Sequence, residues 1–436
     1  MLSEVVETCS KLIQFDTSNY GGGNSRGEQD AAEWVHAQLT EVGYEPRNFE
    51  SAPGRVSTIL RLRGTDPSLP ALLVHGHLDV VPVEPSDWSF DPFSGDIRDG
   101  SVWGRGALDM KDMDAMMLVV ARDFARGNFT PPRDIIFAFV ADEEDTGEYG
   151  AWFLVKEHPE LFKGVETAIG ESGGYPVYLP NNKRIYPIAT GERGSAWMNL
   201  TARGTAGHGS RKNVDNAVAN LADVVSKLSN YEWPVRITPT VERLLTVLSD
   251  HLQITVDPSD RKSLEKLGSA ARLVESVLTN SVNPTGLTAG YKVNVIPSEA
   301  SATIDGRLLP GTEDEFFAVI DCILGEKVTR EFASFARPVD SSFESSEFAA
   351  MEAALIKYDP EAIVLPYTMS GGTDAKAFSS LGISCYGFAP GFNAPEFDPW
   401  TYVHGVDEHI PTESLEFGVQ VLRTYLSSSP NDLLQT

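Results

Sequence analysis

The stretch ALLVHGHLDVVP, residues 71–82, decides how the fold of this chain is predicted. Its first four residues are apolar, which is typical of a strand buried on both faces of a parallel sheet. His75, His77 and Asp79 follow at intervals of two, and a strand directs such residues to one face. In open α/β sheets this end of the strand is where ligands bind. The pattern therefore predicts a metal or proton site, although a single histidine here is also compatible with a purely structural role.

The length and charge of the chain limit what it can be. With 436 residues it exceeds one ordinary core, so we expect two domains. Its 35 Lys and Arg against 62 Asp and Glu give a formal net charge of −27. Such a charge opposes binding to nucleic acid or to an anionic membrane surface, and we expect neither partner.

The cysteines and the N-terminal segment favour a cytoplasmic location. Cys9, Cys322 and Cys385 are far apart and odd in number, so no disulfide framework or Cys-based zinc site is expected. The first residues, MLSEVVETCSKLIQFDTSN, lack the basic start and continuous apolar stretch of a signal peptide. No apolar run reaches the roughly 18–20 residues of a membrane span.

The organisation along the chain predicts an α/β fold with an insertion. Strand and helix patterns alternate over residues 1–190 and resume at 337–436, which indicates a mixed, mostly parallel sheet covered by helices. Residues 191–336 instead combine strands of alternating polarity with helices, as in an antiparallel α+β unit. We therefore predict one domain from the two outer segments and a second domain inserted into it.

Further polar residues stand at the ends of predicted elements. Asp109 precedes a helix, the acidic run ADEED at 141–145 follows the apolar strand 135–140, and Glu171 follows another apolar segment. His404 and His409 precede the last long helix. Each has an ordinary alternative, such as a helix N-cap or a solvated turn. Together, imidazoles and carboxylates without cysteine suit a catalytic zinc or related divalent site, and a cation would offset repulsion among the carboxylates.

Seven motifs occur in an order that supports a family resemblance: HGHLDVVP, VWGRGALDMK, ADEE, GESGG, NVIP…DGR, SGGTDA and HGVDEHIP. Over essentially its full length the chain resembles the di-zinc aminoacylase and carboxypeptidase family, which includes acetylornithine deacetylase, succinyl-diaminopimelate desuccinylase, glutamate carboxypeptidase and dipeptidases. The resemblance implies a catalytic domain of zinc-peptidase type, with 191–336 as a lid or dimerisation domain. It also implies two divalent metal ions, Zn²⁺ in the first place and Co²⁺ or Mn²⁺ as alternatives.

The resemblance assigns roles to individual residues. The implied metal ligands are His77, Asp109, Glu144, Glu171 and His404. Asp109 would bridge the two ions, and the peptide bond that follows this residue is often cis in the family. Asp79 would orient His77, and Glu143 would be the general base. Adjacent residues of a strand face opposite ways, so Glu143 and Glu144 can share one site only if the chain leaves the sheet at Asp142. His75 and His409 are then left with structural roles.

The resemblance also implies how substrate is bound. Asn294 and Arg307 match a carboxylate-binding pair, and Arg offers a bidentate fork to such a group. Ser370, Gly371, Gly372 and Thr373 open a helix and can present backbone N–H groups to the same anion. His208, between two glycines, would donate to the oxyanion and act in the site of the partner subunit of a homodimer.

The implied reaction is hydrolysis of the amide bond of an N-acyl-amino acid or short peptide with a free carboxylate. A hydroxide bridging the zinc ions would attack, with Glu143 as general base. Glu at position 171 favours a deacylase, and carboxypeptidase or dipeptidase activity stays open. A non-catalytic, ligand-binding relative is disfavoured because every ligand position is filled, and a phosphatase or nuclease is disfavoured by the negative charge.

Overall fold

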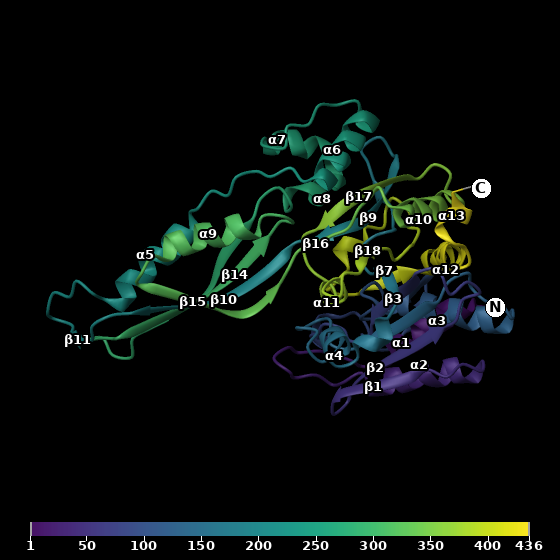
Figure 1. Ribbon diagram of the computed structural model, residues 1–436, viewed down its shortest axis with the longest axis horizontal. Coiled ribbons are helices and arrows are strands. Elements are labelled where there is room, and N and C mark those ends of the chain that lie inside the picture. The colour runs from purple at the N-terminus through teal and green to yellow at the C-terminus, as the bar shows by residue number, and fades with distance from the viewer. Residues whose placement is uncertain (1, 435–436) are drawn as a thin grey trace.

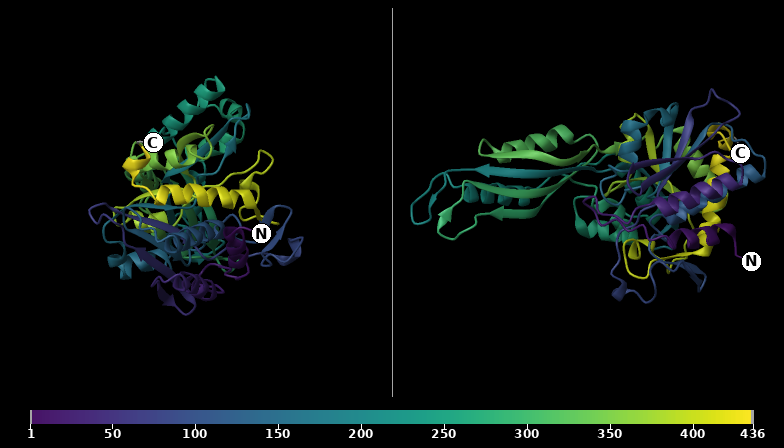
Figure 2. Two further views of the ribbon diagram at one scale, coloured as in Figure 1. Left: turned by 90° about the vertical axis from the view of Figure 1, so that its right-hand side faces the viewer. Right: turned by 90° about the horizontal axis from the view of Figure 1, so that it is seen from below.

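The structure is a computed structural model, and it describes residues 2–434. It consists of a large body, which carries both ends of the chain, and an arm that extends away from it (Figure 1). The view from below shows the same protruding arm (Figure 2, right). The predicted mixed α/β fold is confirmed, with one mostly parallel central sheet and separate antiparallel sheets. Within residues 2–434 no helix combines the length and the apolar character that crossing a membrane requires.

The body is built on a sheet of ten strands in the order β1-β2-β6-β3-β7-β18-β9-β16, with β17 and β8 also paired to β9. The central strands β6, β3, β7 and β18 run parallel, and antiparallel strands flank them. The bounds of the strands are β1 Arg47–Ala52, β2 Arg55–Leu62, β3 Ala71–His77, β6 Ile135–Val140, β7 Val165–Gly170, β8 Val177–Tyr178, β9 Arg184–Glu192, β16 Val339–Asp340, β17 Ile363–Met369 and β18 Ser384–Gly387.

Strand β3 has the environment that its apolar sequence predicts. All seven of its residues are buried. Leu72 and Val74 join the hydrophobic core on one face of the sheet, and Ala71 and Leu73 join the core on the other face. A strand covered on both faces has no polar side, which explains the unbroken apolar run before His75.

Helices cover both faces of this sheet. One core is formed with α1 (Glu4–Ile13), α2 (Gln29–Glu41), α3 (Lys111–Arg126), α10 (Ser346–Ile356), α12 (Thr412–Leu426) and α13 (Pro430–Leu433). The other is formed with α4 (Ala151–Glu157), η2 (Pro159–Phe162) and α11 (Ala375–Ser379). Because α1 packs against both α3 and α12, the first and last segments of the chain build one body (Figure 1). A small sheet, β4 (Asp96–Arg98), β5 (Ser101–Trp103) and β19 (His409–Pro411), and two short helices, η1 (Pro85–Asp87) and η4 (Pro399–Thr401), complete it.

The arm contains a four-stranded antiparallel sheet in the order β12-β14-β10-β15. Its strands are β10 (Gly194–Arg203), β12 (Ser281–Ala289), β14 (Glu299–Leu308) and β15 (Val328–Ala336), and its helices are α5 (Ala217–Ser229) and α9 (Glu313–Leu324). Alternate residues of β10 are buried with these helices, as expected for a sheet with one covered face. The short pair β11 (Gly207–His208) and β13 (Val295–Ile296) forms the far end of the arm (Figure 1).

One part of the predicted insertion packs on the body rather than on the arm. The segment α6 (Pro239–Leu252), α7 (Arg261–Leu264), η3 (Glu265–Ala271) and α8 (Arg272–Glu275) forms a hydrophobic cluster with β9 and β17. Leu244 and Leu248, for example, join Leu365 and Tyr367 there. The boundaries predicted at 191 and 336 do not follow this packing, because the apolar face of these helices is covered by the edge of the large sheet. Helix α6 ends at Gln253, which has a left-handed conformation.

Candidate active site

His77 is the last residue of β3, and its ring is fixed by the chain that follows. Its Nδ1 lies 2.9 Å from the backbone carbonyl oxygen of Asp79. Since a carbonyl only accepts, Nδ1 carries the proton, and Nε2 is left for a metal ion. Asp79 was predicted to orient this ring, but its carboxylate oxygen is 3.7 Å from Nδ1, so the backbone oxygen makes the closer contact.

The carboxylate of Asp79 holds the acidic loop, residues 141–145, instead. Its two oxygens accept from the backbone N–H groups of Glu143 at 3.0 Å and Glu144 at 3.1 Å. Strand β6 ends at Val140, and Asp142 has a φ of 70°, so the chain leaves the sheet where the sequence predicts. The side chains of Glu143 and Glu144 can therefore face the same site, although they are neighbours in the chain.

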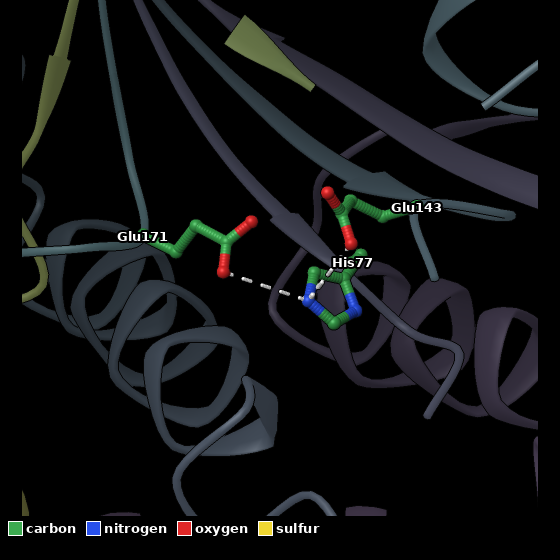
Figure 3. A group of neighbouring side chains, drawn as sticks. All are labelled: His77, Glu143 and Glu171. Atoms are coloured by element: carbon green, nitrogen blue, oxygen red, sulfur yellow. Dashed lines mark ion pairs between the residues drawn. The ribbon is translucent and has the colours of Figure 1, made fainter. Parts of the chain in front are cut away.

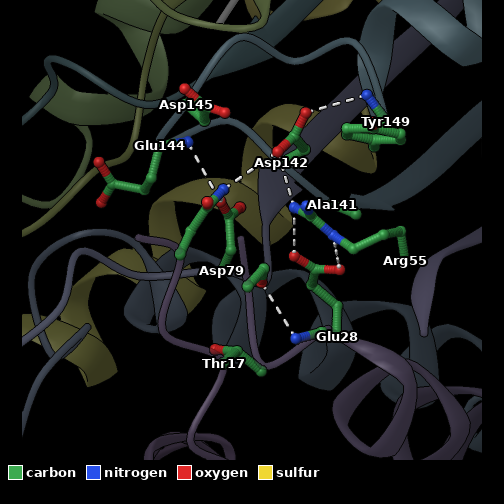
Figure 4. Close-up of polar contacts among 12 residues, drawn as sticks. Thr17, Glu28, Arg55, Asp79, Ala141, Asp142, Glu144, Asp145 and Tyr149 are labelled. Atoms are coloured by element: carbon green, nitrogen blue, oxygen red, sulfur yellow. Dashed lines mark hydrogen bonds and ion pairs between the residues drawn. The ribbon is translucent and has the colours of Figure 1, made fainter. Parts of the chain in front are cut away.

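A buried network lies beneath this loop (Figure 4). The Arg55 guanidinium donates to both carboxylate oxygens of Glu28 at 2.9 Å and to Asp142 at 2.7 Å. The Asn19 amide bridges Asp142 and Asp79, at 3.1 and 2.9 Å. The network fixes the backbone that positions Glu143 and Glu144. Sequence reasoning missed it, because isolated charged residues far apart in the chain show no local pattern.

Asp109 stands between two imidazoles. Its Oδ1 lies 3.0 Å from Nε2 of His77, and its Oδ2 lies 3.0 Å from Nε2 of His404. Asp109 lies two residues before the start of α3, and its peptide bond to Met110 is cis. Glu144 approaches the same imidazole of His404 at 3.3 Å. Asp109 is thus placed where one carboxylate can serve two ions.

Glu171 and Glu143 approach His77 from other sides. Glu171 follows the buried strand β7, and its Oε2 lies 3.9 Å from Nε2 of His77. The Oε2 of Glu143 lies 4.0 Å from the same nitrogen. Figure 3 shows both carboxylates directed toward the ring.

A buried ion pair ties the two loops that carry Asp109 and His404. Arg105 donates to Oε2 of Glu408 at 2.5 Å, and Oε1 of Glu408 accepts from the backbone N–H of Leu108 at 2.7 Å. Arg105 also donates to the backbone carbonyl of His404 at 3.3 Å. Neither Arg105 nor Glu408 was singled out from the sequence, although both lie within the quoted motifs.

The electrostatics of the cluster fit a cation site. Burial raises the pKa of Glu143 and Glu171, and repulsion from neighbouring carboxylates raises both further, that of Glu171 acting on Glu143 and that of Asp109 acting on Glu171. Hydrogen bonds to Asp109 and Glu144 raise the pKa of His404 to about 10. This crowding of acidic groups is costly unless positive charge is supplied.

The donor set and spacing also fit two divalent ions. Ligand atoms of His77, Glu143 and Glu171 lie within 4.8 Å of one another, and so do those of His77, Asp109 and Glu144. Nitrogen and oxygen ligands sit about 2.0–2.2 Å from a zinc ion, so the ligand atoms of one ion lie within a few Å of one another, as the atoms of both groups do. The absence of cysteine from the described cluster is compatible with Zn²⁺, Co²⁺ or Mn²⁺.

The predicted anion-binding residues divide between two places. Arg307 lines a polar cavity of about 680 Å³ together with Glu143, Glu144 and the loop Gly371–Thr373, and Ser370 directly precedes that loop. Lys376, which sequence reasoning missed, lines it as well. The N–H and Oγ1 of Thr373 already donate to Glu192, at 3.0 and 2.5 Å, so this residue is occupied within the protein.

Asn294 and His208 lie together at the far end of the arm. The backbone N–H of Gly209 donates to the Asn294 carbonyl at 2.9 Å, and both predicted side chains are exposed. Strand β14 runs between Asn294 and Arg307, and about eight residues of strand span roughly 26 Å. Within one chain, therefore, Asn294 does not join Arg307, and His208 does not join the metal cluster.

The two remaining histidines make structural contacts. His75 packs against Phe378, with 4.8 Å between ring centroids, and burial together with His77 lowers its pKa to about 3. His409 stacks on Trp103 at 3.8 Å and bonds the Asp407 carbonyl through Nδ1.

A mostly parallel sheet with imidazoles and carboxylates gathered where its central strands end is typical of an α/β protein with a metal site at that edge of the sheet. Residues 73–428 match the model of peptidase family M20/M25/M40, and the chain belongs to this family. The family predicted from the seven motifs is thereby confirmed.

Two named relatives match most of the chain. The chain is 31% identical to human N-fatty-acyl-amino acid synthase/hydrolase PM20D1, over 98% of the chain and 88% of that protein. It is 28% identical to mouse aminoacylase-1, over 94% of the chain and 90% of that protein.

Two solved structures share the fold. An M20 family metallo-carboxypeptidase, Sso-CP2 from Sulfolobus solfataricus, has a TM-score of 0.73 at 20% identity, covering 99% of this chain and 100% of that one. The YXEP protein of Bacillus subtilis, described as a dinuclear metal-binding peptidase, has a TM-score of 0.61 at 14% identity, covering 97% and 96%.

Proposed function

We propose that this family member hydrolyses the amide bond of N-acyl-amino acids, or of short peptides, that carry a free carboxylate. The observation that carries the proposal is the position of Asp109, with one carboxylate oxygen against His77 and the other against His404. Two divalent ions, Zn²⁺ in the first place, would be held by His77, Asp109, Glu144, Glu171 and His404. When bound, they would supply Lewis-acid polarisation and lower the pKa of a coordinated water.

Glu143 is proposed to move the proton. Its backbone is held by Asp79 and its carboxylate faces the cluster, 4.0 Å from His77. The carboxylate takes a proton from the attacking water and passes it to the leaving nitrogen. Burial raises the pKa of Glu143, which brings its basicity closer to that needed near neutral pH. Asp79 acts as a positioning residue in this account, because it orders the loop that presents Glu143.

The polar cavity is proposed to hold the substrate carboxylate. Arg307 and Lys376 supply positive charge, and the backbone of Gly371 and Gly372 adds donors near Glu143. Arg307 is paired with Asp305 at 2.7 Å in this state, so a carboxylate must compete for its fork. In Arg307→Ala the KM for a carboxylate substrate should rise, whereas an amidated substrate should be hydrolysed as in the wild type. An unchanged KM would exclude Arg307 as a binding residue for the substrate carboxylate.

A homodimer is proposed to complete the site. The far part of the arm exposes large apolar side chains, with Val293 at 103%, Val214 at 83% and Tyr291 at 82% relative exposure. A second copy covering this surface would let His208 and Asn294 of one subunit reach the metal cluster of the other, where His208 would donate to the oxyanion.

The three free cysteines are compatible with the proposed cytoplasmic location.

A substrate panel with metal removal tests the proposal. The purified protein is assayed on N-acyl-amino acids and dipeptides, before and after chelation, and again after addition of Zn²⁺, Co²⁺ or Mn²⁺. We expect hydrolysis that disappears on chelation and returns with metal. Preference for dipeptides would favour the dipeptidase or carboxypeptidase alternative. Tight metal binding without hydrolysis of any member would favour a non-catalytic relative and contradict the proposal.

A further inference from the structure

A second cavity opens at the same metal cluster, and its chemistry differs from that of the polar cavity. It has a volume of about 130 Å³ and includes Asp109 and Glu171 in its lining, whereas the polar cavity includes Glu143 and Glu144. The two cavities share no lining residue. The remaining walls of this apolar pocket are mainly the side chains of Met110, Met116, Met369, Trp400, Val403 and Ile410.

The arrangement of the two cavities fixes which part of the substrate each can hold. The cations Arg307 and Lys376 lie only in the polar cavity, which therefore suits the carboxylate on the amine side of the amide. With the amide at the cluster, the acyl side is left to the other cavity. We propose that the apolar pocket binds the acyl group, and that the substrates are amino acids carrying an apolar acyl group. This inference rests on the proposed hydrolysis of N-acyl-amino acids.

The size of the pocket sets the length of that group. An apolar protein cavity of about 150 Å³ accommodates benzene, so a volume of about 130 Å³ suits a chain of about six carbons or one aromatic ring. Met110, Met116 and Ile410 are almost fully buried, which makes the inner wall firm, while Trp400 is partly exposed. Each buried methylene is worth about fourfold in affinity, so kcat/KM should rise steeply from acetyl to hexanoyl and then level off.

Two polar atoms in the lining define the competing occupant. Oδ1 of Asp112 and Oδ1 of Asn393 are buried and have no hydrogen-bond partner among residues 2–434. A pocket used for a cationic chain would pair such an atom with a terminal ammonium. The same panel therefore includes a 6-aminohexanoyl amino acid, which matches hexanoyl in length and differs in charge. If 6-aminohexanoyl is the better substrate, the apolar assignment is wrong.

The experiment measures kcat/KM on one amino acid acylated with acetyl, butanoyl, hexanoyl, octanoyl, dodecanoyl or 6-aminohexanoyl. Ala389 lines the apolar pocket and Ala333 lines the polar cavity, which gives two matched Ala→Phe variants. Ala389→Phe should lower activity on hexanoyl at least tenfold more than on acetyl. Ala333→Phe should change both substrates by the same factor. Equal effects of Ala389→Phe on both substrates would overturn the proposal.

A variant that enlarges the pocket distinguishes a change in substrate preference from general damage to the fold. Met369→Ala removes a half-buried side chain from the wall and should shift the best acyl length upward by about two carbons, which general damage cannot do. An unshifted optimum in acyl length would contradict the assignment.

Different results would contradict the proposed function and the inference about the acyl group. If no N-acyl-amino acid is hydrolysed by the metal-loaded protein, the proposed function fails; if hydrolysis occurs without dependence on chain length, this inference alone fails.

Discussion

The Nε2 atom of His404 lies 3.0 Å from Oδ2 of Asp109, although the two residues come from distant parts of the chain. The other oxygen of Asp109 has the same distance to His77. His77 comes from β3, whereas His404 comes from the loop before β19, and folding the two outer segments into one body brings them together (Figure 1). The centre of the site is therefore a contact that neither segment can make alone.

This position of Asp109 predicts unequal effects of removing single ligands. Asp109→Ala should lose both ions, because one side chain serves two positions, whereas His404→Ala should keep the ion held by His77 and Glu171. Metal content after gel filtration in metal-free buffer measures this, with about two, one and zero ions expected for wild type, His404→Ala and Asp109→Ala. Two retained ions in Asp109→Ala would show that this residue does not bridge.

The Arg105–Glu408 pair should matter for metal binding as well as for stability. Their side chains are 4% and 0% exposed, so Glu408→Gln leaves a buried guanidinium without its charge partner, which costs about 3–5 kcal/mol in the free energy of unfolding. Since the pair ties the loops of Asp109 and His404, metal affinity should fall about 10–100-fold. Denaturant unfolding and metal titration measure the two effects.

A matched pair on the body provides the control. Arg133 and Glu347 form another buried ion pair, with 4% and 14% exposure, away from the metal cluster. Glu347→Gln should lower stability but leave metal affinity unchanged. Equal metal affinity in Glu408→Gln and Glu347→Gln would reduce the Arg105–Glu408 pair to a general stabilising contact.

Removal of metal should make stability depend on pH in a defined direction. Burial and repulsion from neighbouring carboxylates raise the pKa of Glu143 and Glu171 in the metal-free protein. A carboxyl whose folded pKa exceeds its unfolded value contributes stability below the unfolded pKa, and this contribution is lost as pH rises through the folded pKa. The gap in Tm between metal-loaded and chelated protein should therefore be wide at pH 7 and narrow toward pH 5. A constant gap, or one that widens on acidification, would contradict this.

Complementation between inactive subunits tests whether His208 acts in the partner's site. Glu143→Ala and His208→Ala homodimers should each be inactive. After subunit exchange at equal ratio, about half of the dimers should be mixed, with about one intact site in each. Recovered activity supports the trans arrangement. Demonstrated exchange without recovery, or a fully active monomer by light scattering, would exclude it.

Local sequence patterns predicted the elements that carry the cluster. The apolar run before His75 predicted β3, and the acidic run after Val140 required the break that Asp142 makes. Both depend only on neighbouring residues, so they can be read from the chain directly.

Features that depend on which surfaces meet could not be predicted in this way. The Arg55–Glu28 pair joins two residues that look like ordinary surface charges in the sequence. The apolar face of α6 required a covering surface, but nothing in its pattern indicated β17 rather than the arm. The thirteen-residue spacing of Asn294 and Arg307 resembled a binding pair, whereas the extended strand β14 separates them within one chain.

The central claim is that two metal ions and Glu143 have separate roles in one hydrolytic site. The most direct measurement is metal content together with turnover of Glu143→Ala on the best N-acyl-amino acid of the panel. The account predicts that the variant keeps about two ions per chain and loses activity by several orders of magnitude. Turnover like that of the wild type, with the metals in place, would contradict it.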